Sequence, residues 1–143
     1  MKKRRTLMYE MAQTRCAWNA HMRKIALSVG IPDSYRRVIM FVHRNPGVSQ
    51  RSIAEFEDVT TSAVNQVVKS MLAEGYLRKE TDPLDKRSCK LYLTEKGEDA
   101  AHMLRKKLNE SDDAITAFAG EEQEKELMDF LRHLTEFIQK ELE

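Results

Sequence analysis

The chain has 143 residues, 41% of them hydrophobic and 33% charged; this suits one soluble, helix-rich domain, and no apolar run is long enough to span a membrane. The formal net charge of +1 hides an asymmetry, because residues 1–97 carry 18 Lys and Arg against 10 Asp and Glu whereas residues 98–143 carry 6 against 13, which predicts a polyanionic partner for the first part. Two cysteines are too few for a disulfide framework, which favours the reducing cytoplasm.

The chain is predicted to begin with two helices. Apolar residues recur at spacings of three and four from Thr6 to Val29, which predicts a long first helix that stops at Gly30. A second helix is expected from Ser34 to Arg44, because Asn45-Pro46-Gly47 follows it directly and is typical of a helix end.

Two short helices separated by a tight turn are expected next. Ser49 can cap a helix over 50–56, and Thr60 can cap another over 61–73, because a hydroxyl oxygen accepts a hydrogen bond from the free backbone N–H groups of a first turn. Gly75 ends the second of these helices.

The pattern then changes to that of a β-hairpin followed by two long helices. Leu77–Glu80 and Cys89–Leu93 are predicted strands, the second alternating apolar and polar residues, with a polar loop between them. Thr94 is expected to cap a fifth helix. Acidic residues from Glu121 onward suit the first turn of a last helix, where they complement the helix dipole.

These elements predict a mainly α-helical fold with a small β wing. Residues 30–97 form a winged helix-turn-helix lobe, and long helices over 6–29 and 98–143 complete a single 143-residue domain. Such a lobe has too little surface to cover the apolar faces of these helices, so we expect them to meet a second copy of the chain in a homodimer. The apolar stripe of the last helix consists of Leu127, Leu131, Leu134, Ile138 and Leu142.

The helix over 61–73 is the candidate reader of DNA. Val64, Val67, Val68 and Met71 form an apolar stripe that must face inward, which turns a polar face outward. In a winged helix-turn-helix this helix enters the major groove, where Asn and Gln amides pair with adenine and Lys reaches a phosphate or guanine. Any solvent-facing helix is polar, but the lack of acidic residues on this face favours DNA. The outward residues are Thr61, Ser62, Asn65, Gln66, Lys69 and Ser70.

The loop between the strands is the second candidate DNA contact. Lys86 and Arg87 lie at its tip and Lys90 on the returning strand, so that the wing can straddle the phosphate backbone. Arg87 can enter a narrow minor groove, where the negative potential is enhanced. Asp85 is unfavourable beside phosphates unless it holds the loop or Arg87 in shape.

This part of the chain resembles the MarR family of winged helix-turn-helix transcriptional regulators. Asp85-Lys86-Arg87 and Leu91-Tyr92-Leu93-Thr94-Glu95-Lys96-Gly97 are similar to its D-x-R…L-x-L-T-x-K-G wing motif, and residues 72–77 to its recognition-helix exit. The long flanking helices match its dimerisation elements. The resemblance implies a homodimeric repressor on a pseudo-palindromic operator, with Arg87 as the minor-groove arginine and Asp85 as the wing-bracing residue.

One position departs from the family pattern. Where the family has a Leu-Gly pair in the turn between the two short helices, this chain has Glu57-Asp58. Asp tolerates a left-handed backbone better than most residues, and we expect Phe56 to supply the missing apolar contact.

The resemblance also implies a small aromatic ligand, held where the dimer helices meet the DNA-binding lobe. Ordinary core aromatics and a surface histidine explain each residue of the corresponding segments better than a ligand pocket does. The candidates for this ligand pocket are Trp18, His21, Met22, Tyr35 and Phe41.

Cysteine oxidation is an alternative signal. Some members of the family sense organic hydroperoxides through a cysteine in the first helix, which makes Cys16 the candidate redox residue. A lone Cys on an apolar helix face is more often a small buried hydrophobe, and Cys89 is the weaker candidate. The four histidines are scattered along the sequence, so no metal site is predicted.

Two other classes of protein are less favoured. A winged helix can serve as a protein-interaction module that does not bind DNA, but Arg87 and Lys90 in the wing argue against this. An enzyme is disfavoured because the sequence has no Gly-rich phosphate loop and no nucleophile elbow, and no cofactor is expected.

Overall fold

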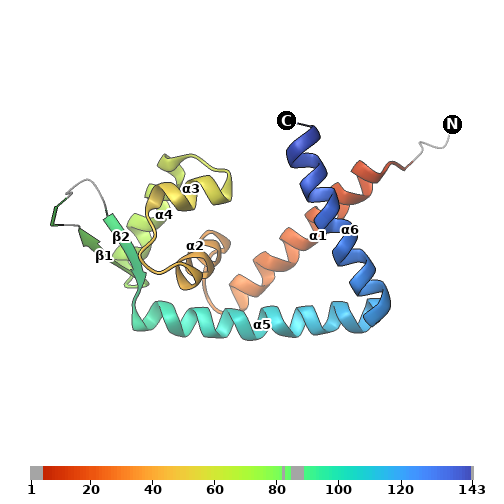
Figure 1. Ribbon diagram of the computed structural model, residues 1–143. Helices are drawn as coiled ribbons and strands as arrows, with labels where there is room; N and C mark the ends of the chain where they lie inside the picture. The colour runs from red at the N-terminus through yellow and green to blue at the C-terminus, as the bar shows by residue number, and fades with distance from the viewer. Residues whose placement is uncertain (1–4, 82, 85–88, 143) are drawn as a thin grey trace. The chain divides into compact units, whose positions relative to one another are not determined.

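The computed structural model describes residues 5–81, 83–84 and 89–142 (Figure 1). The chain divides into two compact units, Met1–Arg105 and Lys106–Glu143. No helix within the described residues is both long and apolar enough to cross a membrane. The elements are α1 (Leu7–Ser28), α2 (Asp33–Arg44), α3 (Gln50–Glu57), α4 (Thr61–Ala73), β1 (Leu77–Thr81), β2 (Cys89–Leu93), α5 (Glu95–Ala119) and α6 (Glu121–Glu141).

The predicted helix ends are confirmed to within one residue for α1 to α4, and for α3 and α4 the predicted caps explain why. Ser49 accepts a hydrogen bond from the backbone N–H of Ser52 at 3.1 Å and begins α3. Thr60 accepts one from the backbone N–H of Ala63 at 3.2 Å and begins α4. Each hydroxyl satisfies a backbone donor that has no partner inside its own helix, so the helix start is set by local chemistry.

The two strands form an antiparallel hairpin between α4 and α5. Leu77 lies opposite Leu93, and Lys79 lies opposite Leu91. Leu91 and Leu93 are buried, whereas Lys90 before them is exposed and Tyr92 between them is half-buried, which confirms the predicted alternation in β2. Val48, in the segment between α2 and α3, pairs with Leu91 and ties the hairpin to the helices.

The first unit has one core, to which every element from α2 to the start of α5 contributes. Its fully buried side chains include Ile39, Ile53, Met71, Leu91 and Leu104, from α2, α3, α4, β2 and α5 respectively. In α1 only the C-terminal part joins this core, since its buried residues are Met22, Ile25 and Ala26.

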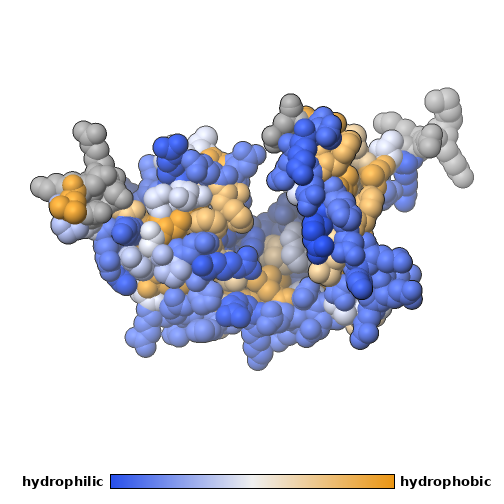
Figure 2. All heavy atoms as spheres, in the orientation of Figure 1, coloured by the Kyte–Doolittle hydropathy of each residue, from blue (hydrophilic) through white to orange (hydrophobic). Residues whose placement is uncertain are grey.

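α5 is amphipathic where it joins the first unit. Ala100, Ala101 and Leu104 are buried, while the surface of α5 along the lower edge of Figure 2 is mainly hydrophilic. In the second unit, Thr116 near the end of α5 donates a hydrogen bond to Glu124 of α6 at 2.6 Å. No residue of α6 is buried.

Candidate nucleic-acid interface

α4 has two faces of opposite character. Val64, Val68 and Met71 are buried and Val67 is half-buried, so the predicted inward stripe is confirmed. The opposite face carries amides, hydroxyls and one ammonium group, with no carboxylate. Its exposed residues are the six expected from the sequence, namely Thr61, Ser62, Asn65, Gln66, Lys69 and Ser70.

The turn before α4 adopts the conformation that the sequence suggested. Asp58 has φ 51° and ψ 48°, in the left-handed region, and no other described residue except glycine has a positive φ. Its neighbour Glu57 replaces the apolar residue of the family pattern and pairs with Arg37 of α2, with 3.3 Å between Nη1 and Oε2. An ion pair therefore links α3 to α2 where the family pattern has a leucine.

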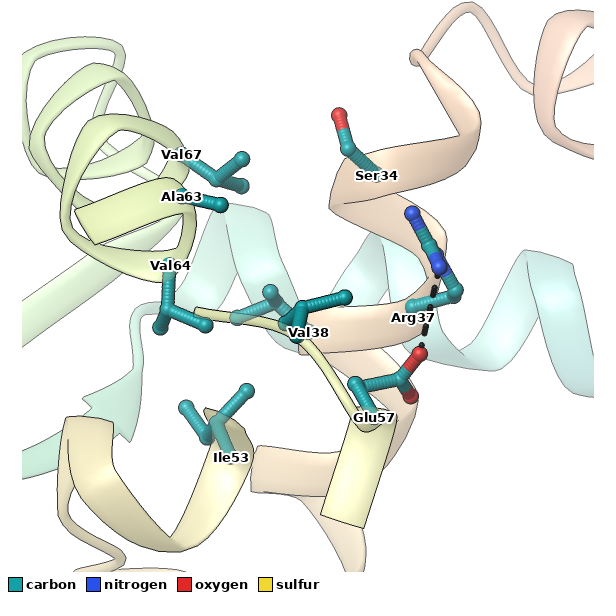
Figure 3. Close-up of a pocket in the computed structure, with 9 residues that line it drawn as sticks. Ser34, Arg37, Val38, Ile53, Glu57, Ala63, Val64 and Val67 are labelled. Carbon is teal, nitrogen blue, oxygen red and sulfur yellow. Dashed lines mark hydrogen bonds and ion pairs between the residues drawn. The ribbon is translucent and has the colours of Figure 1, made fainter. Parts of the chain in front are cut away.

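Phe56 does not fill the space that this replacement leaves, so the expected apolar contact is only partly made. Its ring packs against Phe41 with 4.6 Å between centroids, yet 65% of the residue is exposed. An apolar recess of about 70 Å³ remains between α2, α3 and α4, with the Arg37–Glu57 pair on one side (Figure 3). It is smaller than the roughly 300–1,000 Å³ of typical ligand pockets.

The exit of α4 is held by the residues that follow β2. Thr94 donates a hydrogen bond from its hydroxyl to the carbonyl oxygen of Gly75, and the same hydroxyl accepts one from the backbone N–H of Gly97 at 3.1 Å. A Cβ atom on Gly97 would lie 2.2 Å from the carbonyl oxygen of Tyr76, so only glycine fits there. The Thr-x-Lys-Gly sequence thus joins the start of α5 to the end of α4.

The wing residues are described in part. Lys90 is exposed on β2, opposite Glu80 of β1. Asp85, Lys86 and Arg87 lie outside the described residues.

β1 also contributes exposed cations that the sequence reasoning did not single out. Arg78 lies with its guanidinium carbon 4.5 Å from the centre of the Tyr92 ring and forms an ion pair with Glu80. Lys79 is exposed beside it. Their position in a strand next to α4 could have been recognised from the hairpin prediction, but their side-chain partners could not.

The five residues considered for a ligand pocket take part in several separate contacts. The Trp18 and His21 rings are 6.2 Å apart on α1, and Met22 is part of the core. Tyr35 packs edge-on against Tyr76 at 5.7 Å, whereas Phe41 packs on Phe56 as described above. None of the five lines the recess in Figure 3.

The cysteines and histidines differ from the expectations in two respects. Cys16 is exposed on α1 rather than buried, and Cys89 is half-buried. Two of the scattered histidines come together, because His43 Nδ1 lies 2.8 Å from Glu98 Oε2 and its ring is 6.0 Å from that of His102. Within the described residues, no group of three or more His, Cys, Asp or Glu is arranged to hold a metal ion.

Comparison with known proteins points to one family. The model of the MarR family matches residues 29–88. The chain is 31% identical over 84 residues to the uncharacterized HTH-type transcriptional regulator YybA of Bacillus subtilis, covering 58% of this chain and 56% of that protein. It is 25% identical to the putative transcriptional regulatory protein for the hcr operon of Thauera aromatica, covering 82% of this chain and 71% of that protein.

Solved structures share the fold. The repressor CouR, bound to a 23-mer DNA duplex, has a TM-score of 0.80 at 20% identity and covers 91% of this chain and 92% of its own. MarR itself has a TM-score of 0.78 at 20% identity, covering 95% of this chain and 92% of its own. Together with the match over the helix-turn-helix elements and the regulators among the sequence relatives, these likenesses lead to one conclusion: the chain has the fold of the MarR winged helix-turn-helix transcriptional regulators, and its residues 29–88 are similar in sequence to that family.

Proposed function

We propose that this regulator is a repressor that binds a pseudo-palindromic DNA operator as a homodimer. The observation that carries the proposal is the outward face of α4, which exposes six polar residues and no carboxylate although 23 of the 143 residues of the chain are acidic. A helix face of this kind fits the major groove, since it presents donors and acceptors to base edges without repelling phosphates.

Five of the six exposed polar residues of α4 have a role set by their chemistry. Asn65 and Gln66 read base edges, because their amides can donate and accept at the same adenine. Thr61 and Ser62 lie at the start of the helix, where the backbone N–H groups and the positive end of the dipole favour a phosphate. Lys69, about two turns after them, contacts the phosphate backbone or a guanine.

The wing supplies the minor-groove contact in this proposal. Arg87 inserts into the groove, Asp85 braces the loop, and Lys86 and Lys90 contact the phosphates on either side. The resemblance of the wing motif to that of the family supports these roles, and so does the exposure of Lys90.

A homodimer follows from the uncovered apolar face of α6. Leu127, Leu131 and Ile138 recur at helical spacing and are exposed in the single chain, as are Phe130 and Phe137 beside them. Exposing a stripe of this length to water is unfavourable, so a second copy covers it. Two copies related by a two-fold axis then present two α4 helices to two half-sites.

The test is selection of DNA by the purified full-length protein from sheared genomic fragments of its own source. We expect recovery of one palindromic motif, bound much more tightly than competitor DNA of random sequence. The doubly substituted Asn65→Ala/Gln66→Ala protein should lose this preference, whereas the exposed α1 variant Lys24→Ala should keep it. Equal affinity of the wild type for all fragments would refute an operator-binding function and favour a protein-interaction module.

We propose a small aromatic ligand as the effector, and this ligand lowers the affinity of the protein for the operator. It also raises the melting temperature of the protein, because it binds only the folded dimer.

Oxidation of Cys16 is a second candidate signal, and the exposure of this cysteine favours it. Salicylate should release DNA from the wild type and from Cys16→Ser alike. Release by an organic hydroperoxide from the wild type but not from Cys16→Ser would identify the cysteine as the sensor instead.

A further inference from the structure

We propose that Tyr35, Glu74 and Lys96 act together as an exit clamp on α4, which positions this helix for reading bases without touching DNA. The inference rests on the proposed DNA-binding function and assigns positioning residues to it. It also gives Tyr35 a role other than ligand binding, and it separates Lys96 from the lysines that contact phosphates.

The first part of the exit clamp joins α2 to the end of α4. Glu74 is the C-cap residue of α4, and its Oε1 accepts a hydrogen bond of 2.7 Å from the hydroxyl of Tyr35. Tyr35 is only 6% exposed. Burial, together with the hydrogen bond to Glu74, raises the pKa of the Tyr35 phenol, so the hydroxyl keeps its proton and remains a donor.

The second part joins the start of α5 to the same point. Lys96 Nζ donates a hydrogen bond of 2.8 Å to the backbone carbonyl oxygen of Glu74 and lies 4.2 Å from the centre of the Tyr76 ring. Tyr76 in turn meets the Tyr35 ring edge-on at 5.7 Å. The carboxylate and the carbonyl of one residue are thus held from two different elements, and the Nζ atom of the exposed Lys96 is engaged by the protein itself.

Such a clamp affects specific and non-specific binding differently. α4 has 13 residues and is therefore about 20 Å long, so a tilt of a few degrees about its exit moves its first turn by about 1 Å. Hydrogen bonds to base edges fail at displacements of this size, whereas flexible lysines follow a phosphate over the same distance. Loosening the clamp should therefore lower operator affinity and leave affinity for random DNA unchanged.

The test measures the ratio of operator affinity to random-sequence affinity in the full-length dimer. Tyr35→Phe removes only the hydroxyl and should lower this ratio about 3- to 10-fold, the effect of one hydrogen bond. Glu74→Ala should lower it similarly, whereas Glu74→Gln, which keeps an acceptor oxygen, should stay near the wild type. The double variant Tyr35→Phe/Glu74→Ala should be no worse than Glu74→Ala, because both changes break the same bond.

Lys96 is tested against Lys90. Lys96→Met should lower the ratio of operator affinity to random-sequence affinity without changing the salt dependence of random-sequence binding. Lys90→Met should instead reduce the slope of log affinity against log salt concentration by the amount expected for about one phosphate contact. A loss of one contact for Lys96→Met would identify it as a phosphate ligand and overturn the proposal for that residue.

The ratio also separates the proposal from misfolding and from failure of the proposed function. A smaller folded fraction lowers both affinities equally and leaves the ratio unchanged, and thermal melting reports it independently. If the wild type itself shows no preference for any sequence, the proposed function fails. If the wild type has a preference that Tyr35→Phe and Glu74→Ala both retain, only the exit clamp is refuted.

Discussion

α4 and α6 carry the same kind of apolar stripe, but the stripe of α4 is buried and that of α6 is not. In α4 the stripe is covered within the chain, since Val64, Val68 and Met71 are buried by the other elements of the first unit. In α6 no residue is buried, although Leu131 and Ile138 lie in an equally regular stripe. The comparison shows that helical periodicity identifies an apolar face but does not reveal whether the same chain or another one covers it.

The difference has an energetic consequence. Fully burying one Leu or Ile side chain is worth about 1.5–3 kcal/mol, so the α4 stripe stabilises the folded lobe while the α6 stripe is available to stabilise association. Substitutions in α4 should therefore act on folding, and substitutions in α6 should act on assembly.

The largest effect is expected from the α6 stripe. Leu131→Glu places a charge in the face proposed to join two copies, so it should convert the dimer into monomers. Loss of the second half-site contact should weaken operator binding by about 10²- to 10⁴-fold. Analytical ultracentrifugation measures the assembly, and fluorescence anisotropy measures the binding.

The matched control for this prediction is Lys125→Glu, which changes an exposed polar position of the same helix; this variant should remain dimeric.

Deletion of residues 121–143 should act like Leu131→Glu and give monomer or aggregate. A soluble truncated chain that still binds a palindrome as a dimer would show that α6 is not the dimerisation element.

The counterpart in α4 is a loss of stability. Met71→Ala removes a fully buried side chain and leaves a cavity, which should lower the free energy of unfolding by about 2–5 kcal/mol. Lys69→Ala, two residues earlier on the exposed face, should change it by less than about 0.5 kcal/mol. Urea unfolding at fixed protein concentration measures both, and similar midpoints for the two variants would contradict the contrast between the faces.

The exposed face of α4 should change specificity rather than stability. Gln66→Ala should relax the preference at defined base pairs, with a loss of about 1–3 kcal/mol in discrimination. Lys69→Ala should instead weaken binding to all sequences alike and reduce the salt slope by about one. Selection from random DNA measures the motif of each variant, and an unchanged motif for Gln66→Ala would remove this residue from base reading.

The smallest effect concerns alkaline pH. The pKa of Tyr35 is raised above 10.0 in the folded state, so above that pH the unfolded chain loses a proton that the folded chain retains. The folded state then binds more protons, and its stability falls as the pH rises. Below pH 10.0 this contribution is fully present. Urea unfolding at pH 8.5 and 10.5 should show a smaller alkaline loss for Tyr35→Phe than for Tyr9→Phe, which alters an exposed tyrosine.

Most of the fold could be predicted because its determinants are local. Ser49 and Thr60 act on backbone groups three residues away, and the alternation in β2 depends on its own residues. The left-handed turn at Asp58 could also be predicted from the sequence, because few residue types tolerate that conformation. The six polar residues of α4 followed directly from the stripe on its other side.

The rest depends on pairs of residues that only packing brings together. The sequence by itself determined the helices, the hairpin, the polar face of α4 and the family motif, because each is set by neighbours within a few residues. Only the tertiary structure decided that Tyr35 meets Glu74, 39 residues later, and that Phe56 stays exposed while Arg37 pairs with Glu57. It also decided that Cys16 lies at the surface. Contacts of this kind depend on how whole elements pack, and no local pattern in the chain encodes them.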